Sequence, residues 1–251
     1  MILLTSGYKS DRGLLRENNE DSFFVNDKVG VYIVADGMGG HNGGEIASTI
    51  AVNALGKILS QHLEVKKDKD IHNITQKALQ ATNEEIILKK KRHLELMNMG
   101  TTIVFSVFFK SIFYFSHLGD SRAYLYRKEG KLIQLTNDDS LVTEMVKHGM
   151  LSKNEARTHS LKHIVTKYLG ANNFVMPEIQ QCHVREEDCM ILCSDGLTNL
   201  LGDEEILSTV KKNISEGPQS VCNTLVDIAN NKGGDDNITV ILIQNKECIL
   251  G

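Results

Sequence analysis

Two long stretches in the N-terminal half of the chain repeat apolar residues at helical spacing. One covers residues 44–63 and the other begins at residue 71; the repeating positions are Ile46, Ile50, Ala54, Ile58, Ile71, Ile74, Ala78 and Ala81. A repeat of three to four residues places these side chains on one face of a helix. The pattern therefore predicts two amphipathic helices, each with one buried face.

Most of the remaining chain consists of short β-branched or apolar runs that are typical of strands. After two short runs near the N-terminus, strands are predicted at 30–35, 101–109, 111–117, 122–127, 132–135, 175–183, 189–193 and 237–243, and helices at 203–212 and 218–230. Because strands occur in blocks and helices in pairs, the pattern favours a sheet-on-sheet sandwich covered by helices over an alternating βαβ fold. We expect one α+β domain over residues 1–251, built on a central antiparallel β-sandwich.

The segment 138–173 differs from its surroundings. It is polar and weakly patterned, with short helical pieces and few β-branched runs. Long connections without regular structure are uncommon in compact domains and are often functional. We interpret this segment as an insertion that lies over the main body.

Composition and charge exclude several classes of protein. An apolar share of 41% and a charged share of 24% are ordinary for a globular domain. No apolar run approaches the ~18 residues of a membrane span, and the N-terminus lacks the features of a secretory signal, so we expect a cytoplasmic protein with no membrane partner. The net charge of -4 is mild, and the basic run 89–92 has no interleaved aromatic residues, so nucleic acid is not an expected partner.

Acidic residues fall at the ends of four predicted strands. Asp36, Asp120 and Asp195 follow strands, Asp235 and Asp236 precede the last one, and glycines flank all four places. If the strand ends meet at one edge of a sandwich, the carboxylates repel one another unless protons or cations intervene, and hard oxygen ligands favour magnesium, manganese or calcium over zinc. A single Asp-Gly pair is more often a turn signal than a ligand. Four such places favour a metal site.

An ordered set of motifs resembles the metal-dependent protein phosphatases of type 2C in their compact bacterial form. The motifs span nearly the whole chain: Arg16-Glu17-Asn18-Asn19-Glu20-Asp21, Val34-Ala35-Asp36-Gly37-Met38-Gly39-Gly40-His41, Gly100-Thr101-Thr102, Leu118-Gly119-Asp120-Ser121-Arg122, Cys193-Ser194-Asp195-Gly196-Leu197 and Gly234-Asp235-Asp236-Asn237-Ile238-Thr239. Each motif alone is weak, but their order is specific. The resemblance implies a β-sandwich flanked on both faces by pairs of antiparallel helices, in α-β-β-α layers, with a flap at about 138–173.

The same resemblance implies a centre of two Mn²⁺ or Mg²⁺ ions at one edge of the sandwich. Asp36 resembles the carboxylate that bridges both ions, and the Gly37 carbonyl resembles a ligand to one of them. Asp195 and Asp236 would hold the other ion. Glu20 and Asp21 resemble the acidic pair that binds metal directly or through water. Asp120 resembles the acid that, together with Asp195, holds a third ion.

Two further residues are candidates for catalysis together with Asp36. Arg16 lies four residues before Glu20, and its planar guanidinium could hold two phosphate oxygens; the alternative is a surface arginine paired with a nearby acid. His41 follows the Asp36-Gly37 turn, and the resemblance supports a role as general acid to the leaving oxygen; the alternative is a helix cap or a solvated histidine. Gly100-Thr101-Thr102 is assigned a structural role, and Asn237 is expected to orient Asp236.

The five cysteines do not suggest a second mechanism. Their number is odd, no pair has CxxC spacing, and none is followed by arginine in a Cys-x5-Arg loop. We therefore expect reduced thiols and a nucleophile derived from water.

Three hypotheses for function remain open. The leading one is hydrolysis of phosphoserine and phosphothreonine in proteins by a monomer that opposes a cognate bacterial serine/threonine kinase. The others are a regulatory pseudophosphatase with weak or no turnover and a calcium-binding β-sandwich module. One departure from the family lies in the flap, where Thr136-Asn137-Asp138-Asp139-Ser140 carries Asp139 at a position often occupied by histidine.

Overall fold

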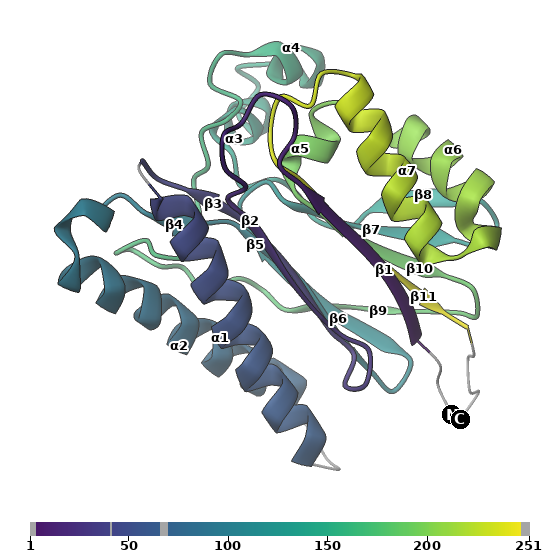
Figure 1. Ribbon diagram of the computed structural model, residues 1–251, viewed down its shortest axis with the longest axis horizontal. Coiled ribbons are helices and arrows are strands. Elements are labelled where there is room, and N and C mark those ends of the chain that lie inside the picture. Colours follow the sequence, from purple (N-terminus) through teal and green to yellow (C-terminus); the bar gives the residue numbers. More distant parts are fainter. Residues whose placement is uncertain (1–3, 41, 66–69, 247–251) are drawn as a thin grey trace.

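The computed structural model describes residues 4–40, 42–65 and 70–246. Its strands form two antiparallel sheets, which Figure 1 shows between helices on either side. The first sheet has the strand order β1-β11-β10-β7-β8, with bounds Leu4–Asp11, Ile238–Asn245, Cys189–Cys193, Arg122–Arg127 and Lys131–Gln134. The second has the order β2-β3-β5-β6-β9, and its strands span Asp21–Asn26, Val31–Met38, Ile103–Phe109, Ile112–Leu118 and Gln180–His183 in that order. The short strand β4 (Gly100–Thr101) pairs with β3. The prediction of an α+β fold with antiparallel sheets is confirmed.

Two helix pairs cover the sheets. The pair α1 and α2 packs on the second sheet, and α6 and α7 pack on the first (Figure 1). Helix α1 spans Gly43–Val65, α2 spans Ile71–Arg92, α6 spans Asp203–Asn213 and α7 spans Pro218–Asn231. Short 3₁₀ turns follow α2 at Leu94–Leu96 and α6 at Ile214–Glu216. All four helices lie where the apolar spacing predicted them. Within the described residues, none of the helices is long and apolar enough to cross a membrane.

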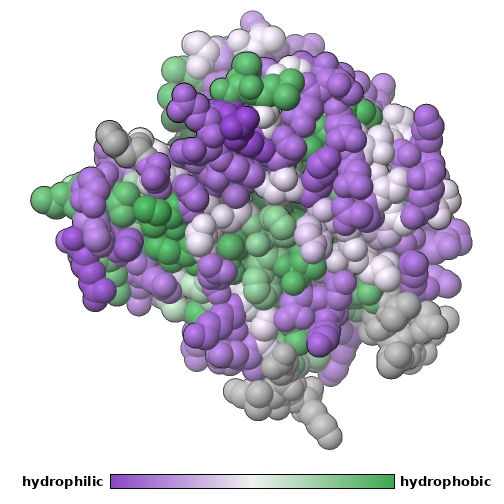
Figure 2. Space-filling view, viewed as in Figure 1, coloured by the Kyte–Doolittle hydropathy of each residue, from purple (hydrophilic) through white to green (hydrophobic). Residues whose placement is uncertain are grey.

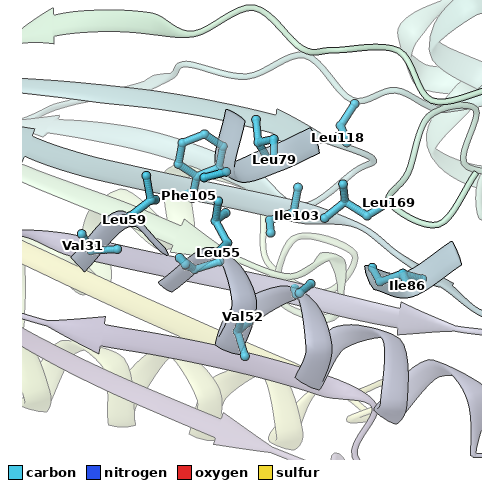
Figure 3. Close-up of a cluster of buried hydrophobic side chains, with 14 of the residues drawn as sticks. Val31, Val52, Leu55, Leu59, Leu79, Ile86, Ile103, Phe105, Leu118 and Leu169 are labelled. Atoms are coloured by element: carbon cyan, nitrogen blue, oxygen red, sulfur yellow. The ribbon is translucent and has the colours of Figure 1, made fainter. Parts of the chain in front are cut away.

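Three clusters of buried side chains form the core. The first joins α1 and α2 to the second sheet, and Figure 3 shows helix residues such as Leu55 and Leu79 meeting strand residues such as Ile103 and Phe105. The second joins α6 and α7 to the first sheet. The third includes Val34 and Leu192 and draws on strands of both sheets. Burial of each side chain contributes roughly 1.5–3 kcal/mol, so these contacts fix how the strand ends are placed.

An apolar strip marks one open edge between the sheets. Figure 2 shows apolar side chains between hydrophilic flanks on the face where β1 and β2 lie in Figure 1. Tyr8 of β1 and Phe23 of β2 have ring centroids 5.0 Å apart across this edge. Such aromatic contacts add about 0.5–1.5 kcal/mol and hold the two sheets together near the start of β2.

The segment 138–173 contains only two short helices, α3 (Leu141–Lys147) and α4 (Lys153–Thr158). The bridge between Leu169 and Thr101 ties its C-terminal part to the body, and the bridge between Ser140 and Val165 joins two parts of the segment itself. The strand predicted at 175–183 is limited to β9, and the strand predicted at 101–109 is divided into β4 and β5 at Thr102.

Candidate metal centre

Asp36 lies near the end of β3, with its backbone fixed by two threonines. Its N–H donates to Thr102 Oγ1 at 3.0 Å, and its carbonyl accepts from Thr101 Oγ1 at 2.8 Å and from the Thr102 N–H at 2.9 Å. The hydroxyls therefore satisfy backbone groups, as the structural role assigned to Thr101 and Thr102 requires. These bonds divide β4 from β5 and hold the Asp36 carboxylate in place.

Asp21 is the first residue of β2 and lies directly opposite Asp36 in the β2–β3 register. Ser194 Oγ donates to its Oδ2 at 2.7 Å, and the same Oγ accepts from the Thr239 N–H at 2.9 Å. Asp21 Oδ1 is buried and has no hydrogen-bond partner among the described residues. Sequence reasoning missed Ser194, although its place directly before Asp195 is a signal that could have drawn attention to it.

Asp195 follows β10 and begins the short helix α5 (Asp195–Thr198) instead of occupying a simple turn. Asn199 Nδ2 donates to its Oδ2 at 2.9 Å, while its Oδ1 is buried without a partner in the described part of the chain. The next residue, Gly196, lies so close to β11 that a Cβ there would be 2.0 Å from the Asn237 carbonyl oxygen. The glycine thus allows α5 to approach the last strand.

Asp236 precedes β11 and forms an ion pair with Arg16, with Nη2 to Oδ2 at 2.7 Å. The Arg16 side chain is 52% exposed, so the guanidinium lies at the surface of the site. The Asn237 N–H donates to Asp236 Oδ1 at 2.8 Å. The Asn237 side chain acts elsewhere than expected: it accepts from the Glu20 N–H at 2.8 Å and donates to the Arg12 and Asn18 carbonyls, which fixes the loop before β2.

Two glycines bring Glu20 to the start of α1. The Gly37 N–H donates to the Glu20 carbonyl at 3.1 Å, and a Cβ on Gly37 would lie 2.1 Å from the Gly44 carbonyl oxygen. A Cβ on Gly44 would lie 2.4 Å from Glu20 Oε2. The Glu20 carboxylate therefore lies against the first turn of α1. His41, the predicted general acid, lies outside the described residues.

The carboxyl groups act on one another electrostatically. Burial raises the pKa of Asp21 to about 7, with further contributions from Asp195 and Asp236. Burial and the Asp195 charge raise the pKa of Asp120 to about 8. The pKa of Asp36 is raised well above its usual range, first by burial and then by Asp21, Asp195 and other acids. Without a cation, protons relieve the repulsion.

The pKa of Asp195 responds to the same neighbours. Burial and the Asp236 charge raise the pKa of Asp195, while a hydrogen bond from the Asp36 carboxyl lowers it. For Glu20 the pKa is also raised, first by burial, against the opposing charge of Arg16. A cation can replace the protons on these carboxyl groups and take over their role.

The predicted metal residues are thus brought together from distant parts of the chain: Glu20, Asp21, Asp36, Gly37, Asp120, Asp195 and Asp236. As they stand, no three His, Cys, Asp or Glu side chains in the described ranges enclose a point that could hold a metal ion. The donor set still fits a hard cation, because Asp21 Oδ1 and Asp195 Oδ1 are buried carboxylate oxygens without partners. Ions such as Mg²⁺ keep several waters and need few protein ligands.

Asp139, where this chain departs from the family motif, is held in a local network. Its carboxylate accepts from Lys167 Nζ at 2.5 Å and from the Gly119 N–H at 3.4 Å, and its own N–H donates to the Gly119 carbonyl at 2.8 Å. Lys167 therefore balances the added negative charge. The network ties the turn that carries Asp120 to the end of the flap.

A family model described as protein phosphatase 2C matches residues 15–228 of this chain. The chain belongs to the protein phosphatase 2C family. This membership confirms the resemblance inferred from the motifs and the predicted enzyme class, a protein phosphatase.

Individual members of the protein phosphatase 2C family match over almost their full length. Serine/threonine phosphatase stp from Listeria innocua is 37% identical over 243 residues, which cover 94% of each chain. The crystal structure of the Mycobacterium tuberculosis serine/threonine phosphatase PstP/Ppp superposes with a TM-score of 0.88 at 33% identity, covering 98% of this chain and all of the other. The catalytic domain of PstP in complex with two manganese ions gives a TM-score of 0.87 at 32% identity, with the same coverage.

Proposed function

We propose that this protein phosphatase removes phosphate from phosphoserine and phosphothreonine residues of proteins with a water molecule activated by bound cations. The observation that carries the proposal is the gathering of Asp21, Asp36, Asp195 and Asp236 from separate strands, with buried carboxylate oxygens left unpaired. The family membership and the named serine/threonine phosphatases among its relatives support the same reaction.

Metal dependence follows from this donor set and from the two manganese ions in the related PstP domain. Asp36 would bridge two ions, the Gly37 carbonyl would bind one, and Asp195 and Asp236 would hold the other. Glu20 and Asp21 would bind directly or through water. We further propose that Mg²⁺ can serve in place of Mn²⁺ and that Asp120 and Asp195 hold a third ion. Bound cations of this kind lower the pKa of water and neutralise charge on phosphoryl oxygens.

The protein's own groups orient the reactants. Arg16 is held beside Asp236, where its planar fork can receive two phosphate oxygens at the surface of the site. Ser194 donates to Asp21, so that one carboxylate oxygen is oriented and the other stays available. For His41 we propose proton donation to the leaving serine or threonine oxygen.

The cysteine chemistry of the chain supports a water nucleophile. Burial raises the pKa of Cys193 and Cys222 to about 12 and that of Cys182 to about 11, so these thiols stay protonated at neutral pH. A protonated thiol is a weak nucleophile. The pseudophosphatase and calcium-module hypotheses gain no support from the family membership.

The remaining parts of the proposal concern context. Three separate core clusters support the α-β-β-α order of layers, and the poorly patterned segment 138–173, with its two short helices, supports its assignment as a flap within one domain. We propose that the protein acts as a cytoplasmic monomer and reverses the work of a cognate serine/threonine kinase. Membrane and nucleic-acid partners are not part of this proposal.

The test is an Asp36→Asn variant assayed with Mn²⁺ on a phosphothreonine peptide. Asp36→Asn should lose turnover by at least about 100-fold, because it removes the charge proposed to bridge two cations. Asp235→Asn is the matched control, since Asp235 is the exposed neighbour of Asp236. Wild-type turnover that persists in a chelator, or full activity of a folded Asp36→Asn variant, would refute the assignment.

A further inference from the structure

A pocket of about 400 Å³ opens beside Asp120 and Asp195. These two acids belong to the candidate metal centre, so the pocket is continuous with the place where phosphate would be bound. The flap contributes Lys153, Arg157 and Lys162 to its lining, and Asp203 at the start of α6 also lines it, where it accepts from the Tyr124 hydroxyl at 3.2 Å. The pocket therefore has a basic wall on the flap beside the acidic centre.

The basic wall is not neutralised from within the protein. Within the described residues, Lys153, Arg157 and Lys162 form no ion pair. Glu155, the acid in the same helix, is engaged at the N-cap, where its Oε2 accepts from the Ser152 N–H and Oγ at 2.8 and 2.6 Å. The three cations are left for an external anion.

A half-buried ion pair between Arg122 and Asp138 also lines this pocket. Arg122 Nε donates to Asp138 Oδ1 at 2.8 Å and Arg122 Nη2 donates to Asp138 Oδ2 at 2.7 Å. This two-bond geometry satisfies both side chains and makes Arg122 a fixed part of the wall. Arg122 is thus not a fourth free cation, and Asp138 does not neutralise the flap.

The basic residues of the flap are not all free. Residues 138–173 contain five Lys and Arg residues and four Asp and Glu residues, and Asp138 and Asp139 are already paired with Arg122 and Lys167. A basic surface beside an acidic centre attracts anions to one side of the site only, and its effect weakens as salt screens it. The flap can therefore select substrates by the charge next to the phosphoresidue.

We propose that this pocket is a specificity subsite for anionic side chains that flank the phosphoresidue, with Lys153, Arg157 and Lys162 as its binding groups. The inference rests on the proposed phosphatase function, since a phosphoresidue held at the acidic centre places its chain neighbours beside the pocket. Asp, Glu and a second phosphoresidue share the required negative charge. Peptides with neutral or basic flanks lack this contact.

The experiment compares phosphothreonine peptides that differ only in their flanks. One has neutral flanks, two carry three Asp residues on the N-terminal or the C-terminal side, and two carry a second phosphoserine on either side. Wild type should show a kcat/KM about tenfold higher for an acidic peptide than for the neutral one, since each exposed ion pair adds a modest gain. The advantage should shrink as salt is raised from 50 to 500 mM. Comparing Asp with phosphoserine distinguishes the two sources of charge.

The triple variant Lys153→Ala/Arg157→Ala/Lys162→Ala should bring the ratio of acidic to neutral peptide close to one. The matched control, Lys57→Ala/Lys77→Ala/Lys91→Ala, removes the same charge from exposed positions of α1 and α2 and should keep the wild-type ratio. Arg157→Glu alone should shift the preference toward a peptide with lysine flanks. This single exposed change keeps the test decisive if the triple variant does not fold.

The outcomes separate this inference from the proposed function. Wild type that hydrolyses neutral and acidic peptides equally well, at low and at high salt, overturns the subsite and leaves the phosphatase intact. An acidic preference that survives in the triple variant or in Arg157→Glu also overturns it. Absence of Mn²⁺-dependent hydrolysis of every peptide and of p-nitrophenyl phosphate would instead defeat the proposed function.

Discussion

Asp21 and Asp36 lie opposite each other on neighbouring strands β2 and β3, the first buried and the second half-buried, with the Ser194 hydroxyl bound to Asp21. Two neighbouring carboxylates in such a place repel each other, and a cation or a proton relieves the repulsion. Their register is set by the hydrophobic pairing of the strands, so the fold itself brings the charges together. This relationship leads to the predictions that follow.

The metal-free protein should lose stability as pH rises. The folded-state pKa values of Asp21 and Asp120 are raised to about 7 and about 8, above their usual value of 3.8. A raised carboxyl pKa means that the folded state binds more protons than the unfolded state between about pH 4 and 8, so the free energy of unfolding falls across this window. Thermal melting in chelator should show Tm falling by about 5 °C or more from pH 5 to pH 8.

Saturating Mn²⁺ should flatten this pH dependence, because bound cations replace the protons. Asp120→Asn should weaken it in chelator, since an amide does not titrate. A Tm in chelator that rises steadily from pH 5 to pH 8 would contradict the raised pKa values.

Ser194→Ala should destabilise the protein by about 1–3 kcal/mol. The change leaves Asp21 Oδ2 and the Thr239 N–H without their shared partner, and each unsatisfied buried group is costly. Urea denaturation in chelator measures the loss. Ser208→Ala is the matched control, since Ser208 is exposed and, within the ranges that the structure describes, bonds only to the Glu205 carbonyl; its change should stay within about 0.5 kcal/mol. Equal stability of the two variants would show that the Ser194 contacts do not matter.

Gly196→Ala should cost about 3 kcal/mol and reduce activity, because its Cβ would meet the Asn237 carbonyl at 2.0 Å and displace α5 with Asp195. Gly202→Ala is the control, since a Cβ there meets nothing within 4 Å. Denaturation midpoints and kcat on a phosphopeptide measure both effects. Wild-type midpoints for Gly196→Ala would show that the close approach of α5 and β11 is not required.

Arg16→Ala should lower kcat/KM for a phosphothreonine peptide by about tenfold or more, because it removes the charged two-bond contact that we propose for the phosphate. Arg16→Lys should recover little, since an ammonium cannot form the planar fork. Arg92→Ala, an exposed residue at the end of α2, serves as control. Steady-state kinetics that give equal constants for all four proteins would return Arg16 to the role of a surface partner of Asp236.

Sequence patterns predicted elements better than their contacts. Periodicity placed the four main helices, and the end of β10 at Cys193 was predicted to the residue. The strand expected at 175–183 begins only at Gln180, in part because Pro177 has no N–H to donate to a neighbouring strand. Local propensity does not show whether an edge segment will find a partner.

In the candidate site, too, the sequence predicted which residues take part better than it predicted their contacts. The acidic residues could be selected because glycines and strand ends mark them within short motifs. The contact between Ser194 and Asp21 joins residues 173 positions apart, and the Asn237 side chain serves the loop before β2 instead of its neighbour Asp236. Such contacts depend on how the two sheets are stacked, which no local pattern specifies.

The most direct test of the central claim is anomalous diffraction at the manganese edge from crystals grown with Mn²⁺. The account predicts two strong peaks bounded by the carboxylates of Asp36, Asp195 and Asp236, with Asp36 shared between them. Peaks found only elsewhere on the protein, with none beside these three carboxylates, would contradict it.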